Sequence, residues 1–206
     1  MCFTLDVTTA AMADSNGFQF SAGSLCLDFV ATRESWRDHE RDLLDTPAQL
    51  SDWLAALALP VPAGGLTGGD LASARDLRDA VEGLARALIA GAPADPDHVR
   101  SVNAFARRPT PVFLLRSSGR DRTVVEEVDA SGALSVVARD AIHLFTGASL
   151  SRLRECARDR CSTLFYDRSP SGQRRWCAMK GCGERVASAS YRRRRAAKEP
   201  SLEEIR

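Results

Sequence analysis

Two pairs of cysteines near the end of the chain have the residue type and the spacing to bind a metal ion. Cys156 and Cys161 are separated by four residues, fifteen residues follow, and Cys177 and Cys182 repeat the first spacing. Two short chelating loops bring four soft sulfur ligands together, as a tetrahedral zinc site requires. We therefore expect one structural Zn2+ ion bound by these four cysteines. Disulfides and unrelated buried thiols are the alternatives.

The start of the chain and its apolar runs bear on the disulfide alternative. Residues 1–12 contain no basic residue and include Asp6, which is unlike a secretory signal. The longest apolar runs, such as 54–61, are too short to span a bilayer. We therefore expect a cytoplasmic protein without membrane contact, in which thiols stay reduced.

The residues around the cysteines predict the elements that position them. We expect, in chain order, a short helix ending at Cys156, strands at 163–166 and 174–177 joined by a turn at 169–172, and a helix from Arg185 that ends before Pro200. Trp176 and Tyr191 are expected in the core of this module. Gly183 is expected to let the backbone fold around the metal. Together these elements predict a treble-clef-like zinc finger.

Charge is divided unevenly along the chain. Residues 1–150 carry a balance of −7, residues 151–198 a balance of +10, and the whole chain only +1. A basic block beside an acidic domain indicates a polyanion-binding module. A solvated helix end, whose cations favour the C-terminal dipole, is the alternative for 192–195. The expected nucleic-acid contacts are Arg174, Arg175, Lys180, Arg185, Arg192, Arg193, Arg194, Arg195 and Lys198.

The first three quarters of the chain alternate between helical and strand patterns. Apolar residues repeat at helical spacing after the helix caps expected at Thr46 and Asp70 and over 134–145, and a further helix is expected over 97–107. Two β-rich runs at 111–116 and 123–128 predict a hairpin. A strand at 18–20 and a charged loop over 35–45 are also expected. The predicted class is α+β, with a mainly helical N-terminal domain, a small antiparallel sheet and the C-terminal zinc finger. The expected ranges are a loose leader at 1–15, the α+β domain at 16–148, the finger with its basic helix at 149–198 and a tail at 199–206.

Several of these segments resemble a known family. Arg174-Arg175-Trp176-Cys177-Ala178-Met179, followed by Cys182-Gly183-Glu184-Arg185, resembles the CGNR zinc finger, and 165–169 resembles its hairpin strand and turn. Residues 25–32 resemble the opening of the ABATE domain, which precedes this finger in the family. The resemblance implies a bacterial, stress-linked transcription regulator. Its N-terminal domain is then a candidate sensor for a small-molecule or protein signal.

Two positions depart from the family pattern. Ala31 and Glu184 each stand where the family has Asn. The four cysteines are unaffected, so zinc binding is still expected. The Glu184 carboxylate has three open roles: repelling phosphate, pairing with Arg185, or accepting from a cytosine amino group.

Enzymatic chemistry finds little support in the residues. His39, His98 and His143 are widely scattered, Gly64-Gly65 lacks the lysine of a phosphate loop, and four cysteines leave a zinc ion no open position. We predict a non-enzymatic regulator that binds double-stranded DNA, with homodimerisation left open. The alternatives are a zinc-stabilised ligand- or protein-binding module without nucleic-acid contact, and an RNA-binding accessory factor.

Overall fold

The computed structural model describes residues 17–36, 39–59, 64–124, 128–148 and 150–196. Within them the chain forms helices, short antiparallel strands and two short irregular helices. The helices are α1 (Leu25–Val30), α2 (Pro47–Ala56), α3 (Gly68–Ala90), α4 (Pro96–Ala106), α5 (Ala130–Thr146) and α6 (Glu184–Ala196). The strands are β1 (Arg33–Trp36), β2 (His39–Asp42), β3 (Phe113–Leu115), β4 (Arg122–Val124), β5 (Leu153–Glu155) and β6 (Leu164–Tyr166), and the irregular helices are η1 (Leu150–Arg152) and η2 (Met179–Gly183). The predicted α+β class is confirmed.

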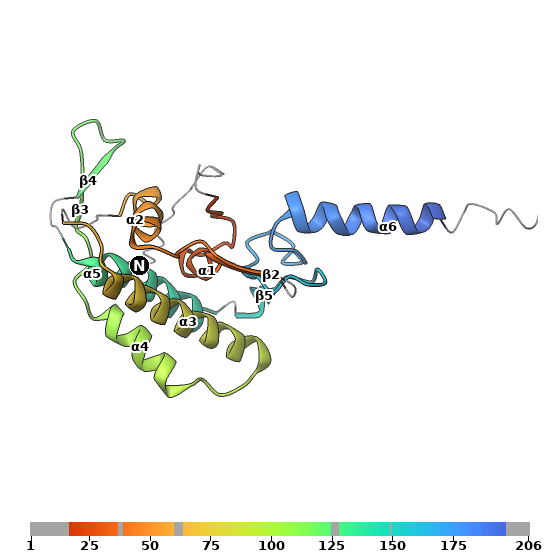
Figure 1. Cartoon of the computed structure of the whole chain (residues 1–206), viewed down its shortest axis with the longest axis horizontal. Coiled ribbons are helices and arrows are strands. Elements are labelled where there is room, and N and C mark those ends of the chain that lie inside the picture. Colours follow the sequence, from red (N-terminus) through yellow and green to blue (C-terminus); the bar gives the residue numbers. More distant parts are fainter. Residues whose placement is uncertain (1–16, 37–38, 60–63, 125–127, 149, 197–206) are drawn as a thin grey trace, which may run out of the picture.

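The body of the molecule is a group of packed helices from which one helix projects. Figure 1 shows α3, α4 and α5 side by side, while α6 points away from the rest of the molecule. None of the described helices combines the length and the apolar character needed to span a bilayer.

The first turns of α2 and α3 both begin with a threonine cap. Thr46 caps α2 as predicted: its hydroxyl accepts from the backbone N–H of Gln49 at 3.3 Å, and Pro47 opens the first turn. At α3 the predicted cap was wrong by one turn. Thr67 is the cap, and Asp70 is its capping-box partner, accepting from the Thr67 backbone N–H at 2.8 Å.

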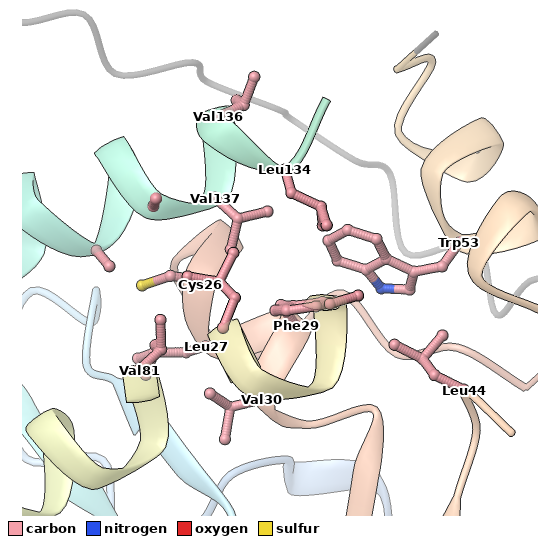
Figure 2. Close-up of a cluster of buried hydrophobic side chains, with 14 of the residues drawn as sticks. Cys26, Leu27, Phe29, Val30, Leu44, Trp53, Val81, Leu134, Val136 and Val137 are labelled. Atoms are coloured by element: carbon pink, nitrogen blue, oxygen red, sulfur yellow. The ribbon is translucent and has the colours of Figure 1, made fainter. Parts of the chain in front are cut away.

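The hydrophobic core gathers around the short helix α1. Figure 2 shows Phe29 of α1 beside Trp53 of α2, with Leu134 of α5 next to both rings and Val81 of α3 next to Leu27. The ring centroids of Phe29 and Trp53 are 4.8 Å apart. Phe29 and Trp53 are fully buried. Burying a side chain of this size stabilises a fold by about 1.5–3 kcal/mol, so α1 is held by packing although it has only six residues.

One charged side chain lies inside this core. The buried guanidinium of Arg78 on α3 donates to both carboxylate oxygens of Asp42 at the end of β2, at 2.7 and 2.5 Å, and to the Thr32 hydroxyl at 3.0 Å. Burial raises the pKa of Asp42, but the hydrogen bonds and charge of Arg78 outweigh it, and the net pKa lies below its ordinary value. The pair therefore anchors the end of β2 to α3.

The strands form three separate two-stranded antiparallel sheets, β1–β2, β3–β4 and β5–β6. The predicted hairpin near 111–128 is present as β3–β4, paired from Phe113 with Val124 to Leu115 with Arg122. The run expected as a charged loop instead forms the β1–β2 hairpin over 33–42. The strands β1 and β2 were not predicted because they are rich in charged residues and lack the alternation of apolar and polar residues that indicates a strand. At 18–20 the structure does not have the expected strand, although Phe18 is buried.

The β5–β6 hairpin joins the finger to the body. Leu153, Leu164 and Phe165 are buried in the same cluster as the side chains of α1, α3 and α5. The backbone N–H of Tyr166 donates to the Ala22 carbonyl at 2.6 Å. Gly23 has φ +87°, and a Cβ there would lie 2.3 Å from the Tyr166 carbonyl oxygen, so only glycine permits this approach.

Candidate metal centre and basic helix

The first cysteine loop follows directly from β5. Strand β5 ends at Glu155, and the Cys156 N–H donates to the Thr163 carbonyl at 3.0 Å across the base of the loop. The loop then turns through Arg160, which has φ +65°. The sequence predicted a helix before Cys156, and that prediction was wrong: the short η1 is followed by a strand, because Leu153 enters the shared core as part of the hairpin.

The second loop repeats this geometry and leads into α6. Gly181, the residue before Cys182, has φ +119°, so both loops place the residue before their second cysteine in the left-handed region. Two glycines shape this loop: Gly181 makes the turn, and the predicted Gly183 lies at a position where a Cβ would meet its neighbour. Gly183 allows the close approach of Met179, whose sulfur would lie 3.0 Å from an added Cβ. Helix α6 begins at the next residue, Glu184.

The four cysteines meet in one cluster. One sulfur from each of Cys156, Cys161, Cys177 and Cys182 lies within 4.8 Å of the others, and all four thiols are free. The Sγ atoms of Cys161, Cys177 and Cys182 are 3.6, 3.8 and 3.9 Å apart. A tetrahedron with zinc–sulfur bonds of 2.3 Å requires sulfur separations of roughly 3.8 Å. The donor set therefore fits one structural Zn2+ ion, as predicted, and the disulfide alternative is not what the structure shows.

The charge state of the cluster explains why it needs a cation. Hydrogen bonds from Cys156 and Cys177 lower the pKa of the Cys161 thiol, whereas donating to Cys156 and Cys161 raises the pKa of Cys177. A divalent cation lets all four release their protons together, which is the condition for a four-thiolate site.

The segment between the two loops is shaped by Asp167, a residue that the sequence analysis did not single out. The carboxylate is fully buried and accepts from the backbone N–H groups of Ser169 at 2.9 Å and Arg174 at 2.8 Å. The Ser169 side chain contributes most, and these backbone hydrogen bonds add to it, so that the pKa of Asp167 is lowered to about 2. An aspartate two residues before Ser169-Pro170 is a turn signal of the kind that could have revealed it.

Residues 174–177 do not form the predicted return strand. Arg174 instead donates through Nε to the Trp176 carbonyl at 2.8 Å and through Nη2 to the Ser21 carbonyl at 3.1 Å, and its guanidinium lies 4.7 Å from the Phe165 ring centroid. The partner strand of β6 is β5. The side chain of Arg174 therefore joins the second cysteine loop to the N-terminal domain.

The other predicted contact residues differ in where the structure places them. Arg175 lies over the Trp176 ring, 5.3 Å from its centroid, and is exposed, as are Lys180 and Arg185 beside the second loop. Arg192, Arg193, Arg194 and Arg195 are exposed on the last turns of α6. Lys198 lies outside the described residues. Trp176 packs against the cysteine cluster as expected, but Tyr191 is 60% exposed, so its predicted core position was wrong.

Two family models match the chain, one for each part. The ABATE model, described as "Putative stress-induced transcription regulator", matches residues 23–148. The chain belongs to the ABATE family. The model of the CGNR zinc finger matches residues 152–195, which include all four clustered cysteines. The resemblance found in the sequence is thus confirmed, and a search of curated proteins finds no match to this ABATE chain.

The departure from the CGNR signature at Glu184 has a local physical account. Glu184 is exposed and is the first residue of α6. A carboxylate in the first turn of a helix interacts favourably with the positive end of the helix dipole, typically by about 0.3–1 kcal/mol. Glutamate is therefore compatible with the geometry of the ABATE chain's finger.

Proposed function

We propose that this ABATE-family chain is a zinc-dependent transcription regulator of the cytoplasm that binds double-stranded DNA through α6 and the second cysteine loop. The carrying observation is that four consecutive arginines are exposed on a helix that projects from the body (Figure 1). The family description supports the regulatory role. The N-terminal domain is, in this proposal, the part that receives a small-molecule or protein signal.

The spacing of residues along α6 supports binding in a groove. Arg185, Arg192 and Arg195 are separated by seven and three positions, which places them on one face of a helix, with the small Ser188 between them. The face extends about 15 Å at 1.5 Å per residue. The major groove of B-DNA admits an α-helix, and arginine binds both phosphates and guanine edges through paired N–H groups.

The composition of α6 indicates that the helix needs a partner. Its thirteen residues have no continuous apolar stripe, and its main contacts with another element are to η2 at its own start. An isolated helix of this length is marginal in water. Adjacent arginines also repel one another, although the C-terminal dipole offsets part of that repulsion. Phosphates would remove the repulsion, so α6 is suited to binding a polyanion.

The remaining basic residues fall into two groups, those that are exposed and one that already contacts the N-terminal domain. Arg175 and Lys180 are exposed on either side of Cys177, and we assign them phosphate contacts that set orientation rather than sequence. Lys198 would extend the same surface. Arg174 holds the finger to the Ser21 carbonyl, and we assign it a positioning role in place of the predicted DNA contact.

The test is duplex binding by the full zinc-loaded chain, measured by fluorescence anisotropy at several salt concentrations. Changing Arg192, Arg193, Arg194 and Arg195 together to Ala should weaken binding about 100-fold at low salt and reduce the salt slope by up to about 4. The matched control changes Arg107, Arg108, Arg116 and Arg120, which are exposed on the N-terminal domain, and removes the same charge. Equal losses for the two variants would contradict the proposal.

Single-stranded RNA is a second candidate because of one observation. Tyr191 is 60% exposed directly before the four arginines, and exposed aromatic rings stack on unpaired bases. Competition between duplex DNA and single-stranded RNA of the same length separates the two candidates. Zinc-loaded protein that binds neither at low salt would favour the ligand- or protein-binding module.

A homodimer is the remaining part of the proposal. One finger contacts too few base pairs to give high specificity, and two copies on paired half-sites would extend the recognised sequence. Light scattering coupled to size exclusion, with and without duplex, tests this directly. A single chain per duplex at saturating protein would exclude the dimer.

A further inference from the structure

A pocket separates the finger from the N-terminal domain beside the metal site. Its volume is about 170 Å³. Cys161, Cys177 and Cys182 line it from the finger, and Ser21, Ala31 and Leu43 line it from the domain. A water molecule occupies about 30 Å³ of liquid, so the pocket has room for several molecules of that size. Three of the four metal-binding cysteines therefore face a space that small molecules can enter.

The four sulfur atoms have different surroundings. Cys156 Sγ accepts from the Cys177 backbone N–H at 3.4 Å, and Cys182 Sγ accepts from the Arg158 guanidinium at 3.5 Å. Cys161 Sγ lies 3.3 Å from the Thr163 hydroxyl. These three cysteines are buried, whereas Cys177 is partly exposed.

Cys177 differs from the others in its hydrogen bonding as well. Its Sγ contacts the sulfur atoms of Cys161 at 3.9 Å and Cys182 at 3.6 Å. Among the described residues, no N–H or O–H donor forms a hydrogen bond to it. Donors around a metal-bound thiolate withdraw electron density from the sulfur and reduce its reactivity. As a whole residue, Cys177 is thus the most exposed of the four, and its sulfur is the one with the least electron withdrawal.

We propose that Cys177 is the reactive position of the metal site, a modification site for small soft electrophiles, hydroperoxides among them, that enter through this pocket. Lys180 and Arg185 line the same pocket together with Glu34, so its charged side chains are positive on balance. Cations near a thiolate favour attack on a polar oxidant.

The reaction with hydrogen peroxide balances with the residues present. The Cys177 thiolate attacks one peroxide oxygen, the O–O bond breaks, and a sulfenic acid and hydroxide form. The thiolate of Cys182, 3.6 Å away, then attacks the Cys177 sulfur, so that a disulfide forms and a second hydroxide leaves. The two sulfurs lose two electrons and the peroxide gains them. A Zn2+ ion bound by the four cysteines would then keep only Cys156 and Cys161 as thiolate ligands and would be held more weakly.

The test measures the reactivity of each cysteine in the full zinc-loaded chain and is independent of DNA binding. Limiting N-ethylmaleimide, followed by peptide mass spectrometry, should label Cys177 at least about 5-fold faster than Cys156, Cys161 or Cys182. Hydrogen peroxide with a sulfenic-acid trap should give the adduct at Cys177, and a chromogenic chelator should detect zinc release in step. Cys26, which is fully buried in the N-terminal core, should stay unlabelled and so reports that the chain remains folded.

A variant tests the route of entry. Ala31→Leu adds side-chain volume to the pocket wall and should slow labelling of Cys177 several-fold with the zinc content unchanged, while Ala187→Leu on the exposed side of α6 should leave the rate unchanged. Faster or equal labelling of another zinc ligand in the unmodified chain would overturn the proposal. An unchanged Cys177 rate in Ala31→Leu would overturn the pocket as the route.

Discussion

The N-terminal domain and the finger are stabilised by different interactions. Around α1 the fold depends on packed hydrocarbon, with Phe29 and Trp53 fully buried, and on one buried ion pair between Arg78 and Asp42. Among the described residues beyond Glu155, Leu164 and Phe165 are buried in the core of the domain. The finger's own apolar cluster consists of Cys156, Cys161 and Cys182, with Trp176 and Cys177 packed against them. A segment with so little hydrocarbon core needs a metal to fold. The domain can therefore keep its shape while the finger depends on an ion.

The boundary between these two regions is a shared hairpin. Leu164 and Phe165 belong to the core of the domain, yet their strand leads out of the first cysteine loop. On the other side Arg86 of α3 donates to the Ser162 carbonyl at 3.1 Å and lies 3.4 Å from the Glu155 carboxylate. These contacts connect the first cysteine loop directly to α3. The following changes test how sharply the two regions separate.

Cys161→Ser should have the largest effect. Removing one of four ligands should release zinc and unfold the cysteine loops and α6, because the free energy of metal binding is the folding free energy of this module. Hydrogen exchange should become fast over 156–196 and stay slow in α3 and α5. Elemental analysis should find less than half a zinc ion per chain.

The matched control is Cys26→Ala, which removes a buried thiol from α1 without touching the metal cluster. It should lower the stability of the domain and leave the zinc content at one ion per chain. Loss of zinc from the control, or slow exchange in α6 without zinc, would contradict the proposed division between the regions.

Arg78→Ala tests the domain side of the comparison. The change removes the buried guanidinium from Asp42, which keeps Arg75 at 3.7 Å and the Leu44 N–H at 2.8 Å. Breaking a fully buried pair typically costs about 3–5 kcal/mol, so we expect a loss of up to about 3 kcal/mol here. Urea unfolding followed by tryptophan fluorescence measures the change. Arg100→Ala is the control, because its pair with Asp97 is largely exposed and contributes about 0–1 kcal/mol. Equal losses in the two variants would contradict the structural role given to Arg78.

Much of this division could be predicted from the sequence, for physical reasons that differ by element. The paired cysteine spacing and the helical spacing of apolar residues in α3 and α5 are local signals, and all three features were predicted from the sequence. The β5–β6 pairing was not, because Leu153 and Cys156 also fit a helical spacing and only burial against α1 decides the matter. The contact of Arg174 with the Ser21 carbonyl could not be predicted for the same reason, because the two residues lie far apart in the chain. Asp167 was missed although its partners Ser169 and Arg174 are close in sequence.

The pH dependence of the domain should identify Asp28. Burial raises the pKa of its carboxyl to about 7, and the charge of Asp140 adds to the rise. The folded chain then holds a proton that the unfolded chain releases near pH 4, so this residue's contribution makes the unfolding free energy fall as pH rises from about 4 to about 7. Asp28→Asn keeps an acceptor for the Ala22 N–H and should lose that part of the pH dependence.

Urea unfolding of both chains at pH 5 and pH 8 measures the Asp28 contribution. Zinc binding also depends on pH, but it contributes equally to both chains, so their difference isolates Asp28. A difference that does not change between the two pH values would contradict the assignment.

Arg160→Gly should have the smallest effect and the opposite sign. Arg160 has φ +65° at the position where the second loop has Gly181. A non-glycine residue in this region costs about 1–2 kcal/mol, part of which is offset by the greater freedom of glycine in the unfolded chain. The finger should therefore gain about 1 kcal/mol or less, measured as resistance to zinc removal by a chelator. Asp159→Gly, one position earlier, should show no gain.

The measurement that tests the central claim most directly is duplex binding by the full chain with zinc bound and after zinc removal, in matched salt. The account predicts salt-dependent binding by the zinc-loaded chain, its loss on chelation and its recovery when zinc is restored. Binding that is unchanged after zinc removal, or absent from the zinc-loaded chain at low salt, would contradict the claim that four cysteines hold α6 in position to bind DNA.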